Sequence, residues 1–429
     1  MANSRRMHLT KAKKGKNDEF YTQWSDIEKE VNAYIEYNPD VFRDKIILLP
    51  ADDPFESNFF KFFATKFNEF GIKKLIATSY APSPIVNTQL SLLPELIPDK
   101  EFEVYLNNQI KEAYKIELTE VIDEDGTGTV NIDDIIKRLQ KERELIDLGK
   151  ESKILSYLKG DDNPDGINSF SAGDFRSLEV TALRDEADMI ITNPPFSLFR
   201  EFLSWINPLE KQFLIIGNMN AITYKEVFPL IKENKIWLGT GMGRWISGFI
   251  VPETYELYGS EARVENGARI VSTNNALWMT NIDHGKRHQA LSLMTMEDNI
   301  KFSKHRTVKG HEYSSYDNFD AIDIPYSDSI PSDYEGIMGV PISFLDKYNP
   351  EQFEIIGLGN GRENFQPNKD YINPKKVMKK SRKVVNGGAI NQVLAISKDE
   401  EPDIKVTYYQ ADNGKYLVAP YARVLIRKK

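Results

Sequence analysis

The stretch Ala187-Asp-Met-Ile-Ile-Thr-Asn-Pro-Pro-Phe196 decides the fold, because it joins an apolar segment to a stiff turn. The apolar run predicts a short buried strand. Pro194 and Pro195 have no N–H to donate and a fixed φ, so the strand ends before them. In open α/β sheets, ligands bind at the carboxyl ends of the strands, which is where this turn falls. The stretch therefore predicts both a sheet and the edge of the sheet that carries a site.

Strands and helices alternate on both sides of this stretch. Apolar runs predict short buried strands at residues 45–50, 74–80 and 212–217. Apolar residues at helical spacing predict helices over residues 24–34, 59–70 and 198–206. Two more short strands are expected within residues 268–282, with a turn at Asn274-Asn275. The alternation predicts an α/β fold, namely a doubly wound, Rossmann-like and largely parallel sheet covered by helices on both faces.

Residues 81–172 do not continue this alternation and are predicted to form an insertion. The segment opens with an irregular stretch that contains four prolines. A hairpin is expected over residues 116–132 and a charged surface helix over residues 133–148. The acidic spacing from Asp123 to Asp134 resembles a calcium-binding EF-hand loop. Its last position is an aspartate rather than the glutamate that binds calcium through both oxygens, so a turn is preferred.

The glycine-rich segment Gly239-Thr-Gly-Met-Gly-Arg-Trp245 is expected to be either a mobile, DNA-facing loop near the active site or a simple flexible turn. It lacks the Lys-Ser/Thr pair of a phosphate-binding loop, so that interpretation is excluded.

The composition indicates a folded protein of a reducing compartment. The chain has 429 residues, of which 41% are hydrophobic, and this is enough for a sizeable core. It has no cysteine, which excludes disulfides, thiolate zinc sites and cysteine nucleophiles. The five histidines show no metal-ligand spacing, so no metal site is predicted. Neither a secretory segment nor an apolar run of roughly 20 residues is visible, so we expect a cytoplasmic protein with no membrane partner.

The charge is distributed unevenly along the chain, although the net charge of −9 alone counts against a polyanionic partner. Residues 1–17 carry six basic residues and no acidic one, and residues 284–429 carry 22 basic and 19 acidic residues. Residues 18–283 carry 27 basic and 45 acidic residues. Basic runs are often only a solvated surface, but three runs outside an acidic body favour contacts with phosphates. The candidate DNA-binding residues are Lys13, Lys14, Lys286, Arg287, Lys304, Arg306, Lys379, Lys380 and Arg382.

The turn Asn193-Pro194-Pro195-Phe196 has the chemistry to receive an aromatic amine. It offers the asparagine side-chain oxygen and backbone carbonyl oxygens, and two of its residues have no backbone donor. Oxygens that accept both amino hydrogens of an adenine direct the nitrogen lone pair outward, and Phe196 can stack on the base. If such an amine is methylated by a sulfonium donor, the methyl group is already activated. The turn then needs no titratable base to deprotonate the amine first. The alternative is a turn in which the prolines only end a strand.

On these residues the chain resembles the EcoRI family of N6-adenine DNA methyltransferases. The family's motifs occur in order: Asp18-Glu-Phe-Tyr-Thr-Gln23, Asp52-Asp-Pro-Phe-Glu-Ser-Asn-Phe59, Lys74-Leu-Ile-Ala-Thr-Ser-Tyr80, Gly173-Asp-Phe175 and the turn at 193–196. Val340-Pro-Ile-Ser-Phe-Leu-Asp346 and the final Tyr421-Ala-Arg-Val are also similar. The resemblance covers most of the chain and is weakest over residues 81–172.

The resemblance implies S-adenosylmethionine as cofactor and double-stranded DNA as partner. It implies that Asn193, Pro194, Pro195 and Phe196 form the catalytic loop that receives a flipped adenine. It also implies that Asp174 accepts from the amino group of the cofactor's adenine and that Phe175 packs on the ring. The residues expected to line the cofactor site are Phe20, Tyr21, Thr22, Asp52, Asp53, Pro54, Ser57, Asn58, Asp174 and Phe175.

The cofactor residues also have structural interpretations. Asp52 or Asp53 suits a helix N-cap, residues 174–175 suit a hydrogen-bonded turn, and residues 20–22 suit a hydrophobic staple followed by an N-cap threonine. The loop over 52–59 lacks the glycines that most methyltransferases have there, and Thr78-Ser79-Tyr80 replaces the usual ribose-binding acid. The family shares both departures.

The sequence thus predicts three regions: a basic arm at 1–17, a catalytic domain at 18–283 and a DNA target-recognition region at 284–429. The predicted activity is site-specific methylation of adenine N6 in duplex DNA, in a restriction-modification or DNA-protection setting. The enzyme is expected to be a monomer, and a cognate restriction endonuclease is its expected functional partner. The alternatives are methylation of RNA adenine or of protein glutamine, and a DNA-binding protein whose methyltransferase fold is vestigial.

Overall fold

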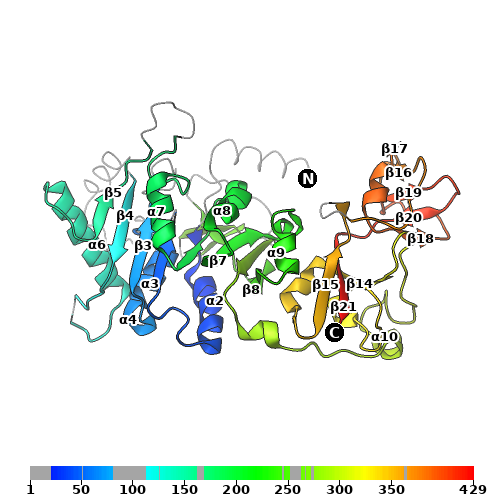
Figure 1. The fold of residues 1–429 in the computed structure, drawn as a ribbon, viewed down its shortest axis with the longest axis horizontal. Coiled ribbons are helices and arrows are strands. Elements are labelled where there is room, and N and C mark those ends of the chain that lie inside the picture. The colour runs from blue at the N-terminus through cyan, green and yellow to red at the C-terminus, as the bar shows by residue number, and fades with distance from the viewer. Residues whose placement is uncertain are drawn as a thin grey trace. The chain divides into compact units, whose positions relative to one another are not determined.

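The structure is a computed structural model in which the described residues form two compact units (Figure 1). Unit 1 takes the described residues up to Met219 and Leu238–Gly285, and unit 2 takes Asn220–Trp237 and Lys286–Lys429. The segment 220–237, which the sequence analysis grouped with the catalytic domain, therefore belongs to unit 2. The described residues are 21–50, 52–80, 113–124, 126–161, 169–243, 246–251, 262–265, 267–271, 275–361 and 365–429.

Unit 1 is built on an eight-stranded sheet with the strand order β5-β4-β3-β2-β6-β7-β12-β8. The four central strands β3-β2-β6-β7 are parallel, whereas β4, β5 and β12 pair antiparallel with their neighbours. The mixed α/β fold is confirmed, with a parallel centre and antiparallel flanks. The strands are β2 (Ile46–Leu49), β3 (Lys74–Thr78), β4 (Tyr114–Leu118), β5 (Leu155–Tyr157), β6 (Met189–Thr192), β7 (Gln212–Asn218), β8 (Trp237–Met242) and β12 (Ala276–Thr280).

Helices cover both faces of this sheet. Alternate residues of a strand point to opposite faces, so Ile47 and Leu48 enter different layers. Ile47 lies in one apolar cluster with Val31, Phe63 and Leu139, which belong to α2, α3 and α6. On the other face α7 contacts β2, and Phe199 of α8 lies against Gly217 of β7. The helices of unit 1 are α2 (Trp24–Tyr37), α3 (Asn58–Thr65), α4 (Phe67–Phe70), α6 (Ile132–Asp147), α7 (Leu178–Glu186) and α8 (Phe199–Ile206).

Local signals explain where these helices begin and end. Ser57 caps α3, because its Oγ accepts from the backbone N–H groups of Phe59 and Phe60. The single helix predicted over 59–70 is interrupted at Lys66, and α4 ends on Gly71, whose φ of 64° suits glycine.

The predicted insertion contributes two strands and the helix α6 to the core of unit 1, so the expectation that it lies outside the core is wrong for these elements. β4 pairs with β3 and β5 rather than forming a hairpin over 116–132. Tyr114, Ile116 and Leu118 of β4 alternate with polar residues and lie in the main apolar cluster. This half-buried alternation is what an edge region of a sheet requires. The four prolines lie outside the described residues.

A second, antiparallel sheet in unit 1 has the order β1-β9-β11-β10. The expected hairpin within 268–282 does not form, because β11 pairs with β9 and β10 whereas β12 pairs with β7. All five residues of β12 are buried, which suits a sheet covered on both faces, whereas β11 is half exposed. The strands are β1 (Tyr21–Thr22), β9 (Phe249–Val251), β10 (Ala262–Glu265) and β11 (Ala268–Val271).

Unit 2 contains two smaller sheets, with the orders β13-β14-β21-β15 and β17-β16-β19-β20-β18. Among the described residues, every helix is too short or too polar to span a lipid bilayer. The elements of unit 2 are α9 (Phe228–Lys232), α10 (Met296–Phe302), β13 (Ile322–Asp323), β14 (Met338–Pro341), β15 (Phe353–Leu358), β16 (Lys375–Val377), β17 (Val384–Asn386), β18 (Ile396–Lys398), β19 (Tyr408–Gln410), β20 (Tyr416–Val418) and β21 (Arg423–Lys428).

Candidate active site

Three of the predicted site segments lie at the ends of three adjacent parallel strands. Asp52 follows β2, Asn193 follows β6 directly, and Ser79 at the end of β3 contacts the segment that contains Asp174. Because the strand order is β3-β2-β6 and all three run parallel, their carboxyl ends lie at one edge of the sheet. This edge is where open α/β sheets bind ligands.

The predicted catalytic turn and the predicted cofactor loop are joined by buried hydrogen bonds. Thr192, the last residue of β6, contacts the Pro50 carbonyl oxygen at 2.9 Å and Asp52 Oδ2 through its hydroxyl. Ser57 Oγ donates to the other carboxylate oxygen, Asp52 Oδ1, at 2.7 Å. Asp52 therefore fixes the loop after β2 to the residue before Asn193, in addition to any contact with a ligand.

Asp53 is held by a residue that the sequence analysis missed. The Tyr114 hydroxyl donates to Asp53 Oδ1 at 2.6 Å, and the Phe55 N–H donates to the same oxygen at 2.9 Å. Burial raises the pKa of Asp53 above its ordinary value, although both hydrogen bonds oppose the shift. No sequence signal identifies Tyr114, which lies 61 positions away on β4.

The N-terminal cofactor segment also reaches this loop. Tyr21 and Thr22 form β1, the Tyr21 hydroxyl donates to Glu56 at 2.5 Å, and Asn58 Nδ2 donates to the Thr22 carbonyl oxygen at 2.8 Å. The Thr22 side chain is buried, and its hydroxyl has no hydrogen-bond partner among the described residues. Pro54 is buried as well, and Phe20 lies outside the described residues.

The catalytic turn is supported by an aromatic contact from the second sheet. The ring centroids of Phe196 and Phe249 are 6.0 Å apart in an edge-to-face arrangement, and Phe249 pairs with Thr22 across β9 and β1. The Pro195 carbonyl oxygen accepts from the Leu198 N–H at 3.0 Å, which begins the short 3₁₀ helix before α8. Segments 21–22, 52–58 and 193–196 are thus brought together.

The pair Asp174-Phe175 is anchored at the end of β3. Gly173 has φ of 78°, and a Cβ there would lie 1.9 Å from the Ser79 carbonyl oxygen, so only glycine fits. Arg176 binds both carboxylate oxygens of Asp174, at 2.9 and 2.7 Å. The Phe175 ring is buried against Phe202 of α8, with a centroid distance of 5.0 Å. Phe175 is 4% exposed and Asp174 is 6% exposed, so neighbouring side chains hold both members of the pair in place.

A family model described as "Adenine-specific methyltransferase EcoRI" matches residues 8–429. The chain belongs to this family. The sequence-based assignment is confirmed, and the protein is an adenine-specific DNA methyltransferase.

Curated relatives of the family match most of the chain. The Type II methyltransferase M.EcoRI of Escherichia coli is 44% identical over 361 residues, which are 82% of this chain and 89% of that protein. The Type II methyltransferases M.MgeORF184P of Mycoplasma genitalium and M.MpnI of Mycoplasma pneumoniae are 31% and 29% identical, each over 81% of this chain and 85% of its own length. No solved structure matches the chain significantly.

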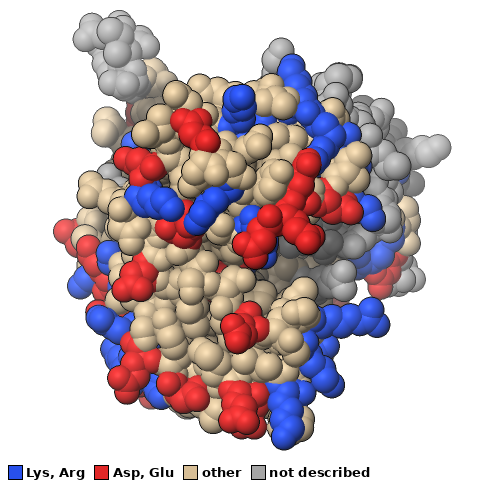
Figure 2. Space-filling model, turned by 90° about the vertical axis from the view of Figure 1, so that its right-hand side faces the viewer, with Lys and Arg blue, Asp and Glu red and all other residues tan. Residues whose placement is uncertain are grey.

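The candidate DNA-binding residues differ in how far they are exposed. Arg306, Lys379 and Lys380 are exposed, and Lys304 is also exposed although it pairs with Asp328 at 2.8 Å. In the view of Figure 2, basic and acidic side chains are interspersed rather than gathered in one basic field. Lys13 and Lys14 lie outside the described residues.

The other three candidates are engaged within unit 2. Arg287 is buried, with its guanidinium 3.6 Å from the centroid of the Trp237 ring, so the structure does not support a role in DNA contact. Lys286 pairs with Asp346 at 2.5 Å, and Arg382 pairs with Glu401 and lies over the Tyr408 ring. The sequence alone could not show that these three residues are engaged with other side chains, because their partners lie far from them in the chain.

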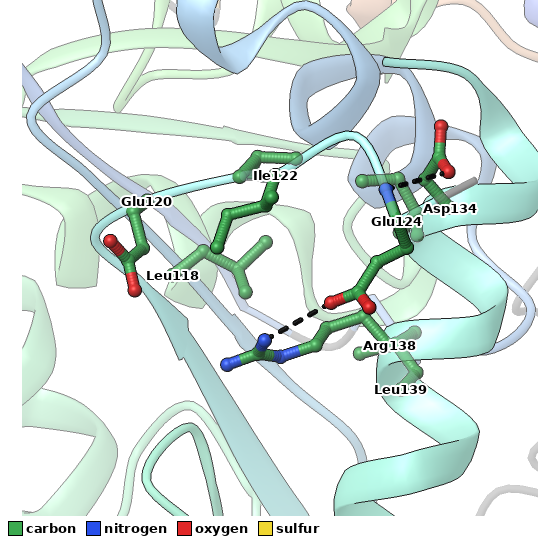
Figure 3. A pocket seen from close by; sticks show the side chains of 9 residues that line it. Leu118, Glu120, Ile122, Glu124, Asp134, Arg138 and Leu139 are labelled. Carbon is green, nitrogen blue, oxygen red and sulfur yellow. Dashed lines mark hydrogen bonds and ion pairs between the residues drawn. The ribbon is translucent and has the colours of Figure 1, made fainter. Parts of the chain in front are cut away.

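The acidic loop that resembles an EF-hand is a hydrogen-bonded turn. Asp123 accepts from the backbone N–H groups of Gly126, Thr127 and Gly128. Asp134 forms a capping box with Asn131 at the start of α6 and also accepts from the Glu124 N–H (Figure 3). Among the described residues, no group of three or more acidic or histidine side chains has the geometry to hold a metal ion. The small pocket beside this turn is lined by Leu118, Glu120, Val121, Ile122, Glu124, Asp134, Ile135, Arg138 and Leu139.

Proposed function

We propose that this enzyme transfers a methyl group from S-adenosylmethionine to N6 of an adenine in duplex DNA at the edge of the eight-stranded sheet. The sheet would then be the Rossmann-like methyltransferase sheet of the family. One observation carries the proposal: the Thr192 hydroxyl bonds to Asp52, so the loop expected to hold the donor adjoins the turn expected to hold the acceptor. The target amine and the donor must meet for direct transfer, and this junction brings their expected sites together.

The residues of the loop fit a nucleoside cofactor. S-adenosylmethionine supplies a methyl group that is already activated on a sulfonium. Asp53 and Asp174 offer carboxylate oxygens to hydroxyl and amino donors, and the buried Thr22 hydroxyl lacks a partner among the described residues. The Thr22 hydroxyl and the Asn58 amide would complete the wall opposite the catalytic turn. We assign cofactor binding to Tyr21, Thr22, Asp52, Asp53, Pro54, Ser57, Asn58, Asp174 and Phe175, and also to Phe20, which lies outside the described residues.

The catalytic turn would receive the target base. The Pro195 carbonyl oxygen already accepts from the Leu198 N–H, and we assign the amine acceptors of the turn to the Asn193 side chain and the Pro194 carbonyl oxygen. Phe249 packs edge-to-face against the Phe196 ring, and we assign stacking on the base to that ring. An adenine inside a duplex does not reach this turn, so the base must be flipped out.

The basic residues of unit 2 and of the N-terminal arm would hold the duplex. Lys304, Arg306, Lys379 and Lys380 are exposed and suited to phosphate contacts. We assign target recognition to the region 284–429 and place the enzyme in the cytoplasm as a monomer. The Type II names of its relatives favour a restriction-modification setting, in which a cognate endonuclease is the functional partner.

The test compares Asn193→Ala with the intact enzyme, using labelled cofactor and duplex DNA. We expect a loss of turnover of at least about 10²-fold, the usual effect of removing a hydrogen-bonding group from a transition state. Duplex binding should be retained. Ser204→Ala, at an exposed position on α8, serves as the control and should be fully active.

Unchanged turnover in the Asn193 variant would remove the catalytic assignment. Parallel incubations with RNA and with protein distinguish the alternative substrates. A wild-type enzyme that binds duplex DNA but neither binds the cofactor nor turns over would be the vestigial binding protein.

A further inference from the structure

We infer that Arg176 is a positioning residue that orients the Asp174 carboxylate so that only Oδ2 remains to accept from the amino group of the cofactor's adenine. The inference rests on the proposed function, because it assumes a nucleoside at the edge of the sheet. It adds a residue that neither the sequence motifs nor the catalytic turn identifies.

The first support is the number of hydrogen bonds on each oxygen of Asp174. Oδ1 accepts from Arg176 Nε at 2.9 Å and from the Arg176 backbone N–H at 3.0 Å. Oδ2 accepts from Arg176 Nη2 at 2.7 Å. An ionised carboxylate offers about four acceptor positions, two on each oxygen. Arg176 therefore fills both positions on Oδ1 and one on Oδ2, and one acceptor position is left on Oδ2.

The second support is that Arg176 is itself fixed on several sides. Its guanidinium carbon lies 4.6 Å from the ring centroid of Phe170 and 5.3 Å from that of Phe175. Its remaining terminal nitrogen donates to Glu201 at 3.2 Å. A planar guanidinium held in this way fixes the plane of the carboxylate that it grips, whereas a lysine would leave that plane free.

The third support is the position of Glu201. This residue lies in the first turn of α8, three residues after the short helix that begins at Phe196. Arg176 thus connects the acid expected to recognise the cofactor's adenine with the helix that follows the catalytic turn. The Asp174 side chain is 6% exposed and the Arg176 side chain is 26% exposed, so the ion pair lies largely within the protein.

The experiment measures binding of two ligands to the full-length enzyme by calorimetry. One ligand is S-adenosylhomocysteine, and the other is the same molecule with purine in place of adenine, so that it lacks the amino group. We expect the wild type to prefer the amino-bearing ligand by about tenfold or more, because a site built for a donor rejects the ligand that lacks it. Arg176→Gln should lose most of this preference by weakening only the amino-bearing ligand.

Steady-state kinetics give a second readout. In Arg176→Gln the KM for the methyl donor should rise by about the same factor as the dissociation constant of the amino-bearing ligand. The kcat at saturation should stay within about twofold, since Arg176 acts on binding of the donor rather than on the acceptor turn.

Two further variants separate positioning from folding. Arg184→Gln removes another arginine that contacts α8, through the Trp205 carbonyl oxygen at 2.7 Å, but does not touch Asp174, and it should keep the wild-type preference. Arg176→Lys keeps the charge without the two-pronged grip and should give an intermediate preference. If the glutamine variant folds poorly, the Arg176→Lys variant still tests the inference.

The possible outcomes are distinct. An unchanged preference in both Arg176 variants would overturn the inference and leave the proposed function intact. Equal weakening of the two ligands would also overturn it, because Arg176 would then only stabilise the fold. A wild-type enzyme that binds neither ligand would overturn the proposed function, and this inference with it.

Discussion

At the scale of single residues, the site depends on carboxylates that other side chains hold in place. Asp53 lies in unit 1 with only 6% of its surface exposed, and two hydrogen bonds from Tyr114 and Phe55 satisfy one of its oxygens. Burying an ionised carboxylate in such a position costs free energy unless hydrogen-bond donors surround it. The hydrogen bond from Tyr114 on β4 therefore helps to hold the loop after β2 in place, although β4 contains none of the sequence motifs.

Removing the phenol of Tyr114 should destabilise unit 1. Tyr114→Phe takes one donor from a buried carboxylate, and hydrogen bonds to charged groups contribute about 1.5–3 kcal/mol. Urea denaturation at neutral pH measures the loss. Tyr37→Phe is the matched control, because its hydroxyl is exposed and lies 3.4 Å from Asp283, and it should change stability by less than about 0.5 kcal/mol. Equal effects of the two changes would contradict the assignment.

The pH dependence of stability should reveal Asp53. Burial raises its pKa in the folded state above the ordinary 3.8, so the folded protein takes up this proton at a higher pH than the unfolded chain. Its contribution to stability is full below the unfolded-state pKa and is lost as pH rises through the folded-state pKa. Asp53→Asn should remove that part of the slope when urea midpoints are compared across mildly acidic pH. An unaltered slope would show that Asp53 does not titrate in this range.

At the scale of elements, residues 239–242 of the glycine-rich segment expected to be a loop belong to strand β8. Glu30 on α2 accepts from the Thr240 N–H at 2.8 Å, the Thr240 hydroxyl at 2.6 Å and the Gly241 N–H at 2.9 Å. The glycines allow β8 to pack closely against α2 and β12 rather than making the segment flexible. A Cβ on Gly239 would lie 2.2 Å from Glu30 Oε1 and 2.6 Å from Trp278 Cβ.

Replacing Gly239 should therefore be costly. Gly239→Ala inserts a methyl group between α2 and β12, and overpacking of this kind costs about 1–3 kcal/mol. Gly285→Ala is the control, because a Cβ there meets only Tyr37 Cδ2, at 3.6 Å. Thermal unfolding of both variants measures the difference. A Gly239 variant as stable as the Gly285 variant would show that β8 shifts freely over α2.

At the scale of the whole molecule, acidic and basic residues are distributed unevenly along the chain. The basic residues outside residues 18–283 include three exposed cations that have no ion pair among the described residues, namely Arg306, Lys379 and Lys380. Each phosphate contact releases counterions, so the affinity for duplex DNA falls with salt in proportion to the number of contacts.

Neutralising two of these cations should change that salt dependence. Lys379→Gln together with Lys380→Gln should weaken duplex binding and reduce the slope of log affinity against log salt by up to about 1.8. Lys137→Gln together with Lys141→Gln makes the same change in net charge on the exposed face of α6 and should leave the slope unaltered. Fluorescence anisotropy between low and physiological salt provides the measurement. Equal slopes for the two double variants would place the duplex elsewhere.

The sequence by itself determined the features that depend on neighbouring residues. The turn at 193–196 follows from two prolines after an apolar strand, because their missing donors and fixed φ end a strand in any fold. The alternation of strands and helices in unit 1, and with it the α/β fold, follows from apolar spacing in the same way. The family assignment followed from motifs that lie in a fixed order.

Only the tertiary structure decided which distant residues meet. The phenol on Asp53, the burial of Arg287 over Trp237 and the separation of β11 and β12 into two sheets all depend on contacts between segments far apart in the chain. The same holds for β4, which the sequence analysis placed in an insertion and the structure places in the sheet. Local propensity carries no information on such contacts, because they form only when burial of several elements at once lowers the free energy.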